Sequence, residues 1–285
     1  MSAPSLPSLL VSDWALSPSV IVPAAACAVL YALAVRRAGG RWPLRRTASF
    51  LGGIACALVA LESGIDVFDS QMLSVHMVQH MLLLLVAPPL LLGGRPVVLA
   101  LRSLSPGPRK VFAKVMDRTR TYTAPVPALP VFSVVVLFTH LPSFYDATLR
   151  HPALHYSEHA LYLLAGVMMF SPLVDGDPAP RHRLGGLGKL SYLIAAMMPM
   201  ALVGAYLNRH ATLLYPAYGP PARALGISAV DDQAQAGAIM WVLGGTIMVA
   251  VGLWAAVAAM VAEERRQVAR ESRASLAAGD GGPPA

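Results

Sequence analysis

Charged residues are scarce in this sequence: Asp, Glu, Lys and Arg make up only 13% of the 285 residues, whereas soluble domains carry roughly a quarter. Cysteine is rarer still, and Cys27 and Cys56 both lie inside apolar segments. These shortages exclude a cytosolic enzyme, a disordered tail protein and a secreted disulfide scaffold. Hydrophobic residues are abundant, at 56% of the chain, and they form runs long enough to enter a bilayer.

Seven long apolar segments predict an all-α, polytopic membrane helix bundle with seven transmembrane helices. They cover residues 18–35, 47–64, 71–93, 125–141, 152–172, 188–207 and 233–262. We expect residues 1–269 to form a single transmembrane domain, and residues 270–285 to form a disordered cytoplasmic tail. The first segment is not expected to be a cleavable signal, because no Lys or Arg precedes it.

The basic residues predict the direction in which the chain crosses the membrane. Nineteen of the 22 Lys and Arg residues fall in the connections after the first, third and fifth segments and in the tail. By the positive-inside rule, the N-terminus is outside and the C-terminus is cytoplasmic. The basic excess therefore suits anionic lipid headgroups, and nucleic acid is not an expected partner.

The histidines gather on the predicted outer side of the membrane, where seven of the eight lie. His76 and His80 share one face of the third helix with Met72 and Gln79. His155 and His159 share one face of the fifth helix with Glu158. His140 ends the fourth helix and is able to face either way. Each H-x-x-x-H pair places two imidazoles one turn apart, within reach of one ion.

These histidines predict a metal site or, alternatively, a set of hydrogen-bonded helix caps. Polar groups in hydrocarbon need mutual partners or a bound ion. Imidazole suits copper, zinc, iron and nickel, and the thioether of Met72 favours Cu(I). We expect ligand roles for His76, His80, His155 and His159, whereas His151 and His210, near the surface, are expected to cap helices.

Other polar residues are candidates for holding the ligands in place. Gln79 and Glu158 lie beside histidines on the two helical faces. Asp232 and Gln233 open the seventh helix, where Asp232 with Gln235 fits a capping box. Helix capping and orientation of a histidine explain this pair equally well. The whole interpretation assumes that the third and fifth helices are neighbours.

Four stretches of the sequence resemble one known family. They are His76-Met-Val-Gln-His80-Met-Leu-Leu with Ala87-Pro-Pro, Thr139-His-Leu-Pro with Tyr145, His155-Tyr-Ser-Glu-His159, and Asp232-Gln-Ala-Gln-Ala-Gly-Ala-Ile-Met-Trp241. The sequence resembles the CtaG family of bacterial cytochrome c oxidase assembly factors over roughly two-thirds of its length. Phe170-Ser-Pro172 departs from the Trp-rich segment expected at that place.

The resemblance implies a seven-span protein of the bacterial cytoplasmic (inner) membrane that helps to build haem-copper oxidases and handles copper on the outer face. It carries over His76, His80, His140, His155 and His159 as site residues, with Asp232 and Gln233 as polar accessories.

The combined prediction is an assembly factor without turnover. It would hold one copper ion and pass it to a subunit of a haem-copper oxidase, with a periplasmic copper donor as a second partner. One alternative is a membrane hydrolase in which three histidines hold zinc and Glu158 is the general base. Another is a membrane cytochrome with haem held between the third and fifth helices.

Overall fold

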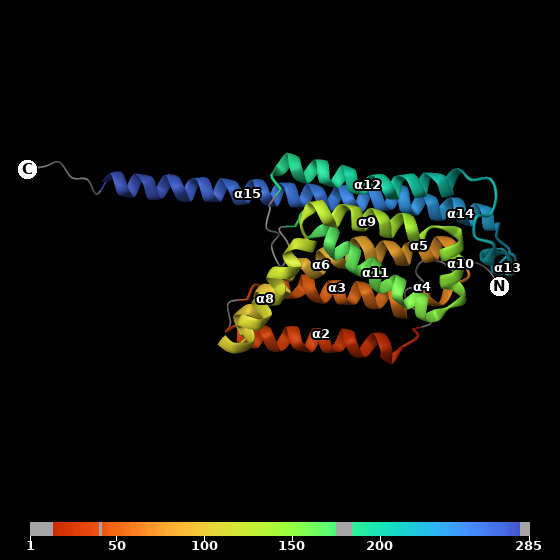
Figure 1. The fold of residues 1–285 in the computed structure, drawn as a ribbon, viewed down its shortest axis with the longest axis horizontal. Coiled ribbons are helices and arrows are strands. Elements are labelled where there is room, and N and C mark those ends of the chain that lie inside the picture. The colour runs from red at the N-terminus through yellow and green to blue at the C-terminus, as the bar shows by residue number, and fades with distance from the viewer. Residues whose placement is uncertain (1–13, 40–41, 175–183, 280–285) are drawn as a thin grey trace, which may run out of the picture.

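The computed structural model describes residues 14–39, 42–174 and 184–279, and all regular structure within these ranges is helical. The long helices run side by side along one axis, and shorter helices cover the two ends of the bundle (Figure 1). The all-helical fold class that the sequence predicts is therefore correct.

Each of the seven apolar segments contains a helix. A long apolar run is recognised from neighbouring residues alone, so the sequence was able to locate these helices. The helices are α2 (Pro18–Arg37), α3 (Leu44–Glu62) with α4 (Gly64–Phe68), α5 (Leu73–Met81) with α6 (Ala87–Gly93), α9 (Pro125–Thr139), α11 (Pro152–Phe170), α12 (Gly186–Arg209), and α14 (Ala229–Ala238) with α15 (Gly244–Gly279). A π-helical turn, Leu82–Val86, joins α5 to α6, and another, Ile239–Leu243, joins α14 to α15.

Four further helices lie outside the predicted apolar segments, or at their edges. They are α7 (Pro96–Ser103), α8 (Pro106–Tyr122), α10 (Pro142–Arg150) and α13 (Gly219–Ala224), with a 3₁₀ turn at Pro216–Tyr218. The helix α8 has no buried residue and lies across one end of the bundle (Figure 1). A search for long apolar windows misses such helices because their length or polarity disqualifies them.

Five helical stretches in the described ranges are long and apolar enough to cross a membrane, and a sixth results if α8 and α9, bent by 68°, count as one span. α9 alone has only 15 residues. α11 carries His155, Glu158 and His159, and these side chains lower its hydropathy. The structure is therefore that of a multi-pass membrane protein.

The central helical stretch runs through α5 and α6, which pack against α3, α11 and α14. Gly166 lets α11 approach this stretch closely, because a Cβ there would collide with the Leu84 carbonyl oxygen and the Pro88 ring. Since α5 and α11 carry the two H-x-x-x-H pairs, this close packing brings the predicted site together.

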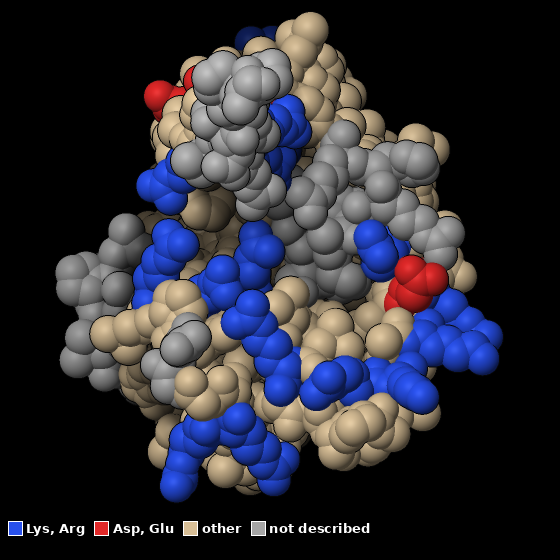
Figure 2. All heavy atoms as spheres, turned by 90° about the vertical axis from the view of Figure 1, so that its left-hand side faces the viewer, with Lys and Arg blue, Asp and Glu red and all other residues tan. Residues whose placement is uncertain are grey.

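The two ends of the bundle differ in chemistry. Lys and Arg gather over the end where α2 finishes, α3 begins and α8 lies (Figures 1 and 2). Three residues that the sequence assigns to this side, Arg41, Arg181 and Arg183, lie outside the described residues, as does His182.

α15 continues as a helix to Gly279, into the stretch where the sequence predicts a disordered tail. The remainder of that tail, 280–285, lies outside the described residues.

Candidate metal centre

Five imidazoles, from His76, His80, His140, His155 and His159, meet inside the bundle at the end opposite the basic face, and we call them the imidazole cluster. On α5, the ring centres of His76 and His80 are 4.3 Å apart, and both side chains are fully buried. On α11, the rings of His155 and His159 are 4.2 Å apart. Both pairs thus lie one helical turn apart, as the i, i+4 spacing requires, with the His76 and His80 rings edge to face and the His155 and His159 rings tilted.

The two pairs face each other across the contact between α5 and α11. The ring centres of His76 and His155 are 5.1 Å apart, and those of His80 and His159 are 6.2 Å apart. His140, which follows the last residue of α9, lies with its ring centre 6.3 Å from that of His80. The structure therefore brings all five histidines of the predicted ligand set into one cluster, and the third and fifth spans are neighbours.

A hydrogen bond to Tyr218 fixes the tautomer of His76. The Tyr218 hydroxyl donates to the backbone oxygen of Asp69 at 3.0 Å, so its oxygen accepts from the His76 Nδ1–H at 2.8 Å. His76 Nε2 is then unprotonated and faces His80 Nε2, 2.8 Å away. His80 donates its Nε2–H across this gap, which leaves His80 Nδ1 unprotonated, buried and without a hydrogen-bond partner.

Gln79 fixes the tautomer of His159 in a similar way. Its amide Nε2 donates to the Ala60 carbonyl oxygen and to Asp66 Oδ1, both at 2.9 Å, and this orients the amide oxygen toward His159. The His159 Nε2–H donates to that oxygen at 3.1 Å, so His159 Nδ1 carries the lone pair. Among the predicted supporting residues, Gln79 is therefore in direct contact with an imidazole.

His140 is held by its own helix. Its Nδ1–H donates to the Val136 carbonyl oxygen at 2.7 Å, and its Nε2 is buried without a partner. Metal-binding histidines usually donate one ring N–H to a carbonyl or other acceptor and present the other nitrogen to the ion. His76, His140 and His159 all follow this pattern.

Buried polar atoms without hydrogen-bond partners are concentrated around the imidazole cluster. Of the twelve such side-chain atoms among the described residues, seven lie here. They are His80 Nδ1, His140 Nε2, His155 Nε2, His159 Nδ1, Asp69 Oδ2 and both carboxylate oxygens of Glu158. Because native proteins leave few buried polar groups unpaired, this concentration suits a ligand that supplies the missing partner.

Three overlapping groups within the cluster have ligand atoms within 4.8 Å of one another: His76 with His80 and His159; Asp69 with His155 and His159; and His76 with His155 and Glu158. Two nitrogens bound tetrahedrally to one ion at typical metal–nitrogen lengths lie about 3.3 Å apart. To share an ion, the Nε2 atoms of His76 and His80 would therefore have to separate by about 0.5 Å, and the His80 proton would have to move from Nε2 to Nδ1.

Several residues at the site carry no motif in the sequence that predicts their position. Asp69 Oδ2 lies 3.6 Å from His155 Nε2, and burial raises the pKa of Asp69 to about 8. Tyr218, whose pKa burial also raises, is joined to Tyr145 by a hydroxyl–hydroxyl contact of 3.4 Å. Asp69 belongs to a run of acidic residues, Glu62, Asp66 and Asp69, just before α5, and that run was the available signal.

Asp232 and Gln233, two more of the predicted supporting residues, hold neighbouring segments of the chain in place. Asp232 accepts from the Leu73 backbone N–H at 2.6 Å and from the Ser74 hydroxyl, so it caps α5. The capping-box interpretation was wrong, because the N-cap of α14 is Ser228. The Gln233 side chain accepts from the Leu214 backbone N–H at 2.7 Å, which holds the segment leading to Tyr218.

Met72 and Glu158 complete this set. Met72 packs against the small apolar cluster of Ile65 and Val75. Glu158 is buried beside the imidazoles of His76 and His155. Of the two surface histidines, His151 is exposed at the start of α11, without a side-chain cap, and His210 bonds to Thr212.

Comparison with known proteins gives this fold a family. The chain is 30% identical over 249 residues to an uncharacterized protein of Mycobacterium leprae, and 31% identical over 252 residues to uncharacterized proteins of Mycobacterium bovis and Mycobacterium tuberculosis. Each match covers 84% of this chain but only 38% of the relative, so the chain spans well under half of their length. No solved structure matches the chain. Residues 29–262 match the family described as cytochrome c oxidase caa3 assembly factor (Caa3_CtaG), and the chain belongs to that family.

Proposed function

We propose that this assembly factor binds one copper ion in the imidazole cluster and delivers it to a subunit of the oxidase. The observation that carries the proposal is the set of buried ring nitrogens without hydrogen-bond partners at His80, His140 and His159, of which His80 and His159 lie in one candidate ligand group with His76. An ion would supply the partner that each of them lacks. The hydrogen bonds that the rings donate to Tyr218, Gln79 and Val136 would hold the rings in the tautomers that an ion requires.

Copper is chosen over zinc because of the family. Imidazole nitrogen suits both metals, and the thioether of Met72, which favoured Cu(I), packs against Ile65 and Val75. A cytochrome c oxidase of the haem-copper type needs copper, whereas the second candidate, a zinc hydrolase, needs a general base at the metal. Glu158, which groups with His76 and His155, is the available base. Metal loading distinguishes the two functions.

The experiment measures metal bound per chain after purification in detergent and loading with Cu(I) or with Zn²⁺ in separate arms. We expect about one copper per chain for the wild type, and almost none for the double variant His76→Ala/His80→Ala. The control is His210→Ala, which changes a half-buried histidine outside the cluster and should bind as the wild type does. Equal copper in the double variant and the wild type would refute the site. Retention of zinc alone, with lipid hydrolysis, would favour the hydrolase.

We also propose seven spans in the bacterial cytoplasmic membrane, with the N-terminus outside. The basic residues then face the cytoplasm, and the imidazole cluster lies under the outer surface, where a periplasmic copper donor and the oxidase subunit would reach it. Cysteine substitutions at Arg150, the last residue of α10, and at Arg118, on α8, test this arrangement. A membrane-impermeant maleimide added to intact cells should label position 150 and not position 118; the reverse pattern would invert the topology.

A further inference from the structure

A groove separates α2 from the rest of the bundle along the middle of that helix. α2 is attached to the bundle at two places: before its first turn, the Ser17 backbone N–H donates to Glu62 Oε2 at 2.6 Å, and nearer its C-terminus, the Tyr31 hydroxyl donates to the Gly94 carbonyl oxygen at 2.7 Å. Between these two attachments, a partly open cavity of about 780 Å³ lies between α2, α3, α6 and α11. Tyr31 is the buried residue of this helix, so the middle of α2 is packed only loosely against the rest of the protein.

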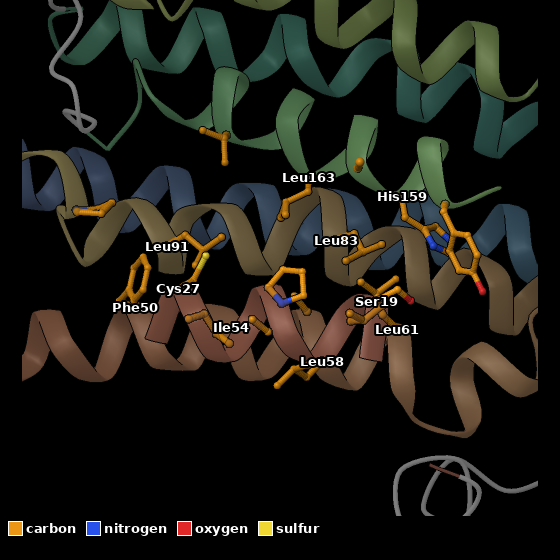
Figure 3. Close-up of a pocket in the computed structure, with 18 of the residues that line it drawn as sticks. Ser19, Cys27, Phe50, Ile54, Leu58, Leu61, Leu83, Leu91, His159 and Leu163 are labelled. Atoms are coloured by element: carbon orange, nitrogen blue, oxygen red, sulfur yellow. The ribbon is translucent and has the colours of Figure 1, made fainter. Parts of the chain in front are cut away.

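The wall of the groove is almost wholly apolar. Ile54, Leu58 and Leu163 line its length, and Phe50 and His159 stand near its opposite ends (Figure 3). An apolar void of this size in a bilayer does not gain from water, because water there would find few polar partners. Hydrocarbon from outside the chain is therefore the suitable filling.

The dimensions of the groove favour a fatty acyl chain over a helix. Phe50 and Leu61, both in the wall, are eleven residues apart on α3, which is about 17 Å along a helix and close to one leaflet of the roughly 30 Å hydrocarbon core. A transmembrane helix about 10 Å wide and 30 Å long displaces roughly 2,400 Å³. That is about three times the volume of the cavity, whereas ligand sites for small molecules fall in its range.

Beyond the Phe50 end of the groove, arginines gather around one aromatic ring. The guanidinium carbon of Arg46 lies 4.7 Å from the centre of the Trp42 ring, and that of Arg102 lies 5.6 Å from it. Arg45 and Arg95 are close enough to repel the charge of Arg46. Within the described part of the chain, none of the four has a carboxylate in salt-bridge range. A phosphate group would relieve this repulsion and match guanidinium geometry.

We propose that the groove binds one anionic phospholipid. One acyl chain lies between α2 and α3, and the phosphate lies against Arg46, Arg95 and Arg102 on the basic end of the bundle (Figure 2). Hydrocarbon then fills the space beside His159. The bound lipid fills the space between the two attachments of α2 and excludes water from one side of the imidazole cluster.

The test uses protein reconstituted in phosphatidylcholine bilayers that contain a chain-labelled spin probe, either phosphatidylglycerol or phosphatidylcholine. We expect one motionally restricted phosphatidylglycerol per protein in the wild type, and much less restricted phosphatidylcholine. Arg46→Gln/Arg102→Gln should weaken retention of phosphatidylglycerol roughly thirtyfold at low salt. Its matched control is Arg118→Gln on the exposed face of α8, which should leave retention unchanged.

A second pair of variants tests the groove itself. Ala24→Trp places an indole in the wall of the groove, whereas Ala25→Trp places one on the exposed side of the same helix. The first should abolish the restricted signal and the second should retain it. Equal restriction of the two lipids in the wild type, or an unchanged signal in Ala24→Trp, would overturn the proposal.

A third measurement leaves the arginines and the α2 wall of the groove unchanged, so its result does not depend on how those variants fold. Cys27 lines the groove, so phosphatidylglycerol should slow its reaction with a membrane-permeant maleimide in a Cys56→Ser background, and phosphatidylcholine should not. The same rate with both lipids would also contradict the proposal.

Discussion

Replacing Tyr218 with Phe removes a single hydroxyl, and the site predicts that copper binding depends on it. This oxygen is fully buried, accepts from His76 Nδ1–H at 2.8 Å and donates to the Asp69 carbonyl at 3.0 Å. Without it, His76 either keeps a buried N–H with no acceptor, at a cost of about 1–3 kcal/mol, or moves its proton to Nε2. The second change blocks the nitrogen that faces His80.

Partners of this kind contribute about 10–100-fold to metal affinity, which corresponds to about 1.4–2.8 kcal/mol. We therefore expect the dissociation constant of Cu(I) to rise by that factor in Tyr218→Phe, measured by competition with a coloured Cu(I) chelator. The control is Tyr192→Phe on α12, because the buried Tyr192 hydroxyl has no hydrogen-bond partner among the described residues. If both variants bind copper as tightly as the wild type, tautomer control by Tyr218 is refuted.

Two further predictions concern the scaffold of the site, and both are read from thermal or SDS unfolding of detergent-purified protein. Asp232→Ala removes the cap on Leu73 and Ser74 at the start of α5 and should lower stability by about 1–2 kcal/mol. The neighbouring exposed Asp231→Ala should change it far less, and equal losses would contradict the capping role. Gly204→Ala should destabilise by about 1–3 kcal/mol, since a Cβ there would lie 2.8 Å from the Gly237 carbonyl oxygen. Gly52→Ala, with open space around its Cβ, should instead stabilise by about 0.5–1 kcal/mol; a shared sign for the two would refute the packing argument.

Local patterns in the sequence were sufficient to locate a helix in each apolar segment and to pair the histidines on helical faces, but they missed α7, α8, α10 and α13. Hydropathy located a helix in each apolar segment, and the spacing of His76 and His80, and of His155 and His159, placed each pair on one face. Such patterns depend only on residues within a few turns, and helix geometry converts them directly into positions in space.

The helical face predicted for Met72 was wrong, because this residue precedes the first turn of α5. Met72 was assigned to the same face as His76 by counting 100° per residue, about the rotation that 3.6 residues per turn implies. The helix α5 begins at Leu73, and Met72 has the extended dihedral angles φ −134° and ψ 121°. Its side chain therefore packs with Ile65 and Val75. The capping-box error at Asp232 has a related cause, because α14 begins earlier, after Ser228.

Which ring nitrogen is available to a metal is a property of packing and not of spacing. His159 takes its acceptor from Gln79, 80 positions away, and His76 takes its acceptor from Tyr218, 142 positions away. Tyr218 is itself oriented by the carbonyl of Asp69, 149 positions away. Two imidazoles with identical local sequence would differ in tautomer if these partners differed, because each hydrogen bond decides where the proton resides. A sequence motif can therefore nominate a histidine as a ligand, but only the assembled bundle determines which of its nitrogens can bind.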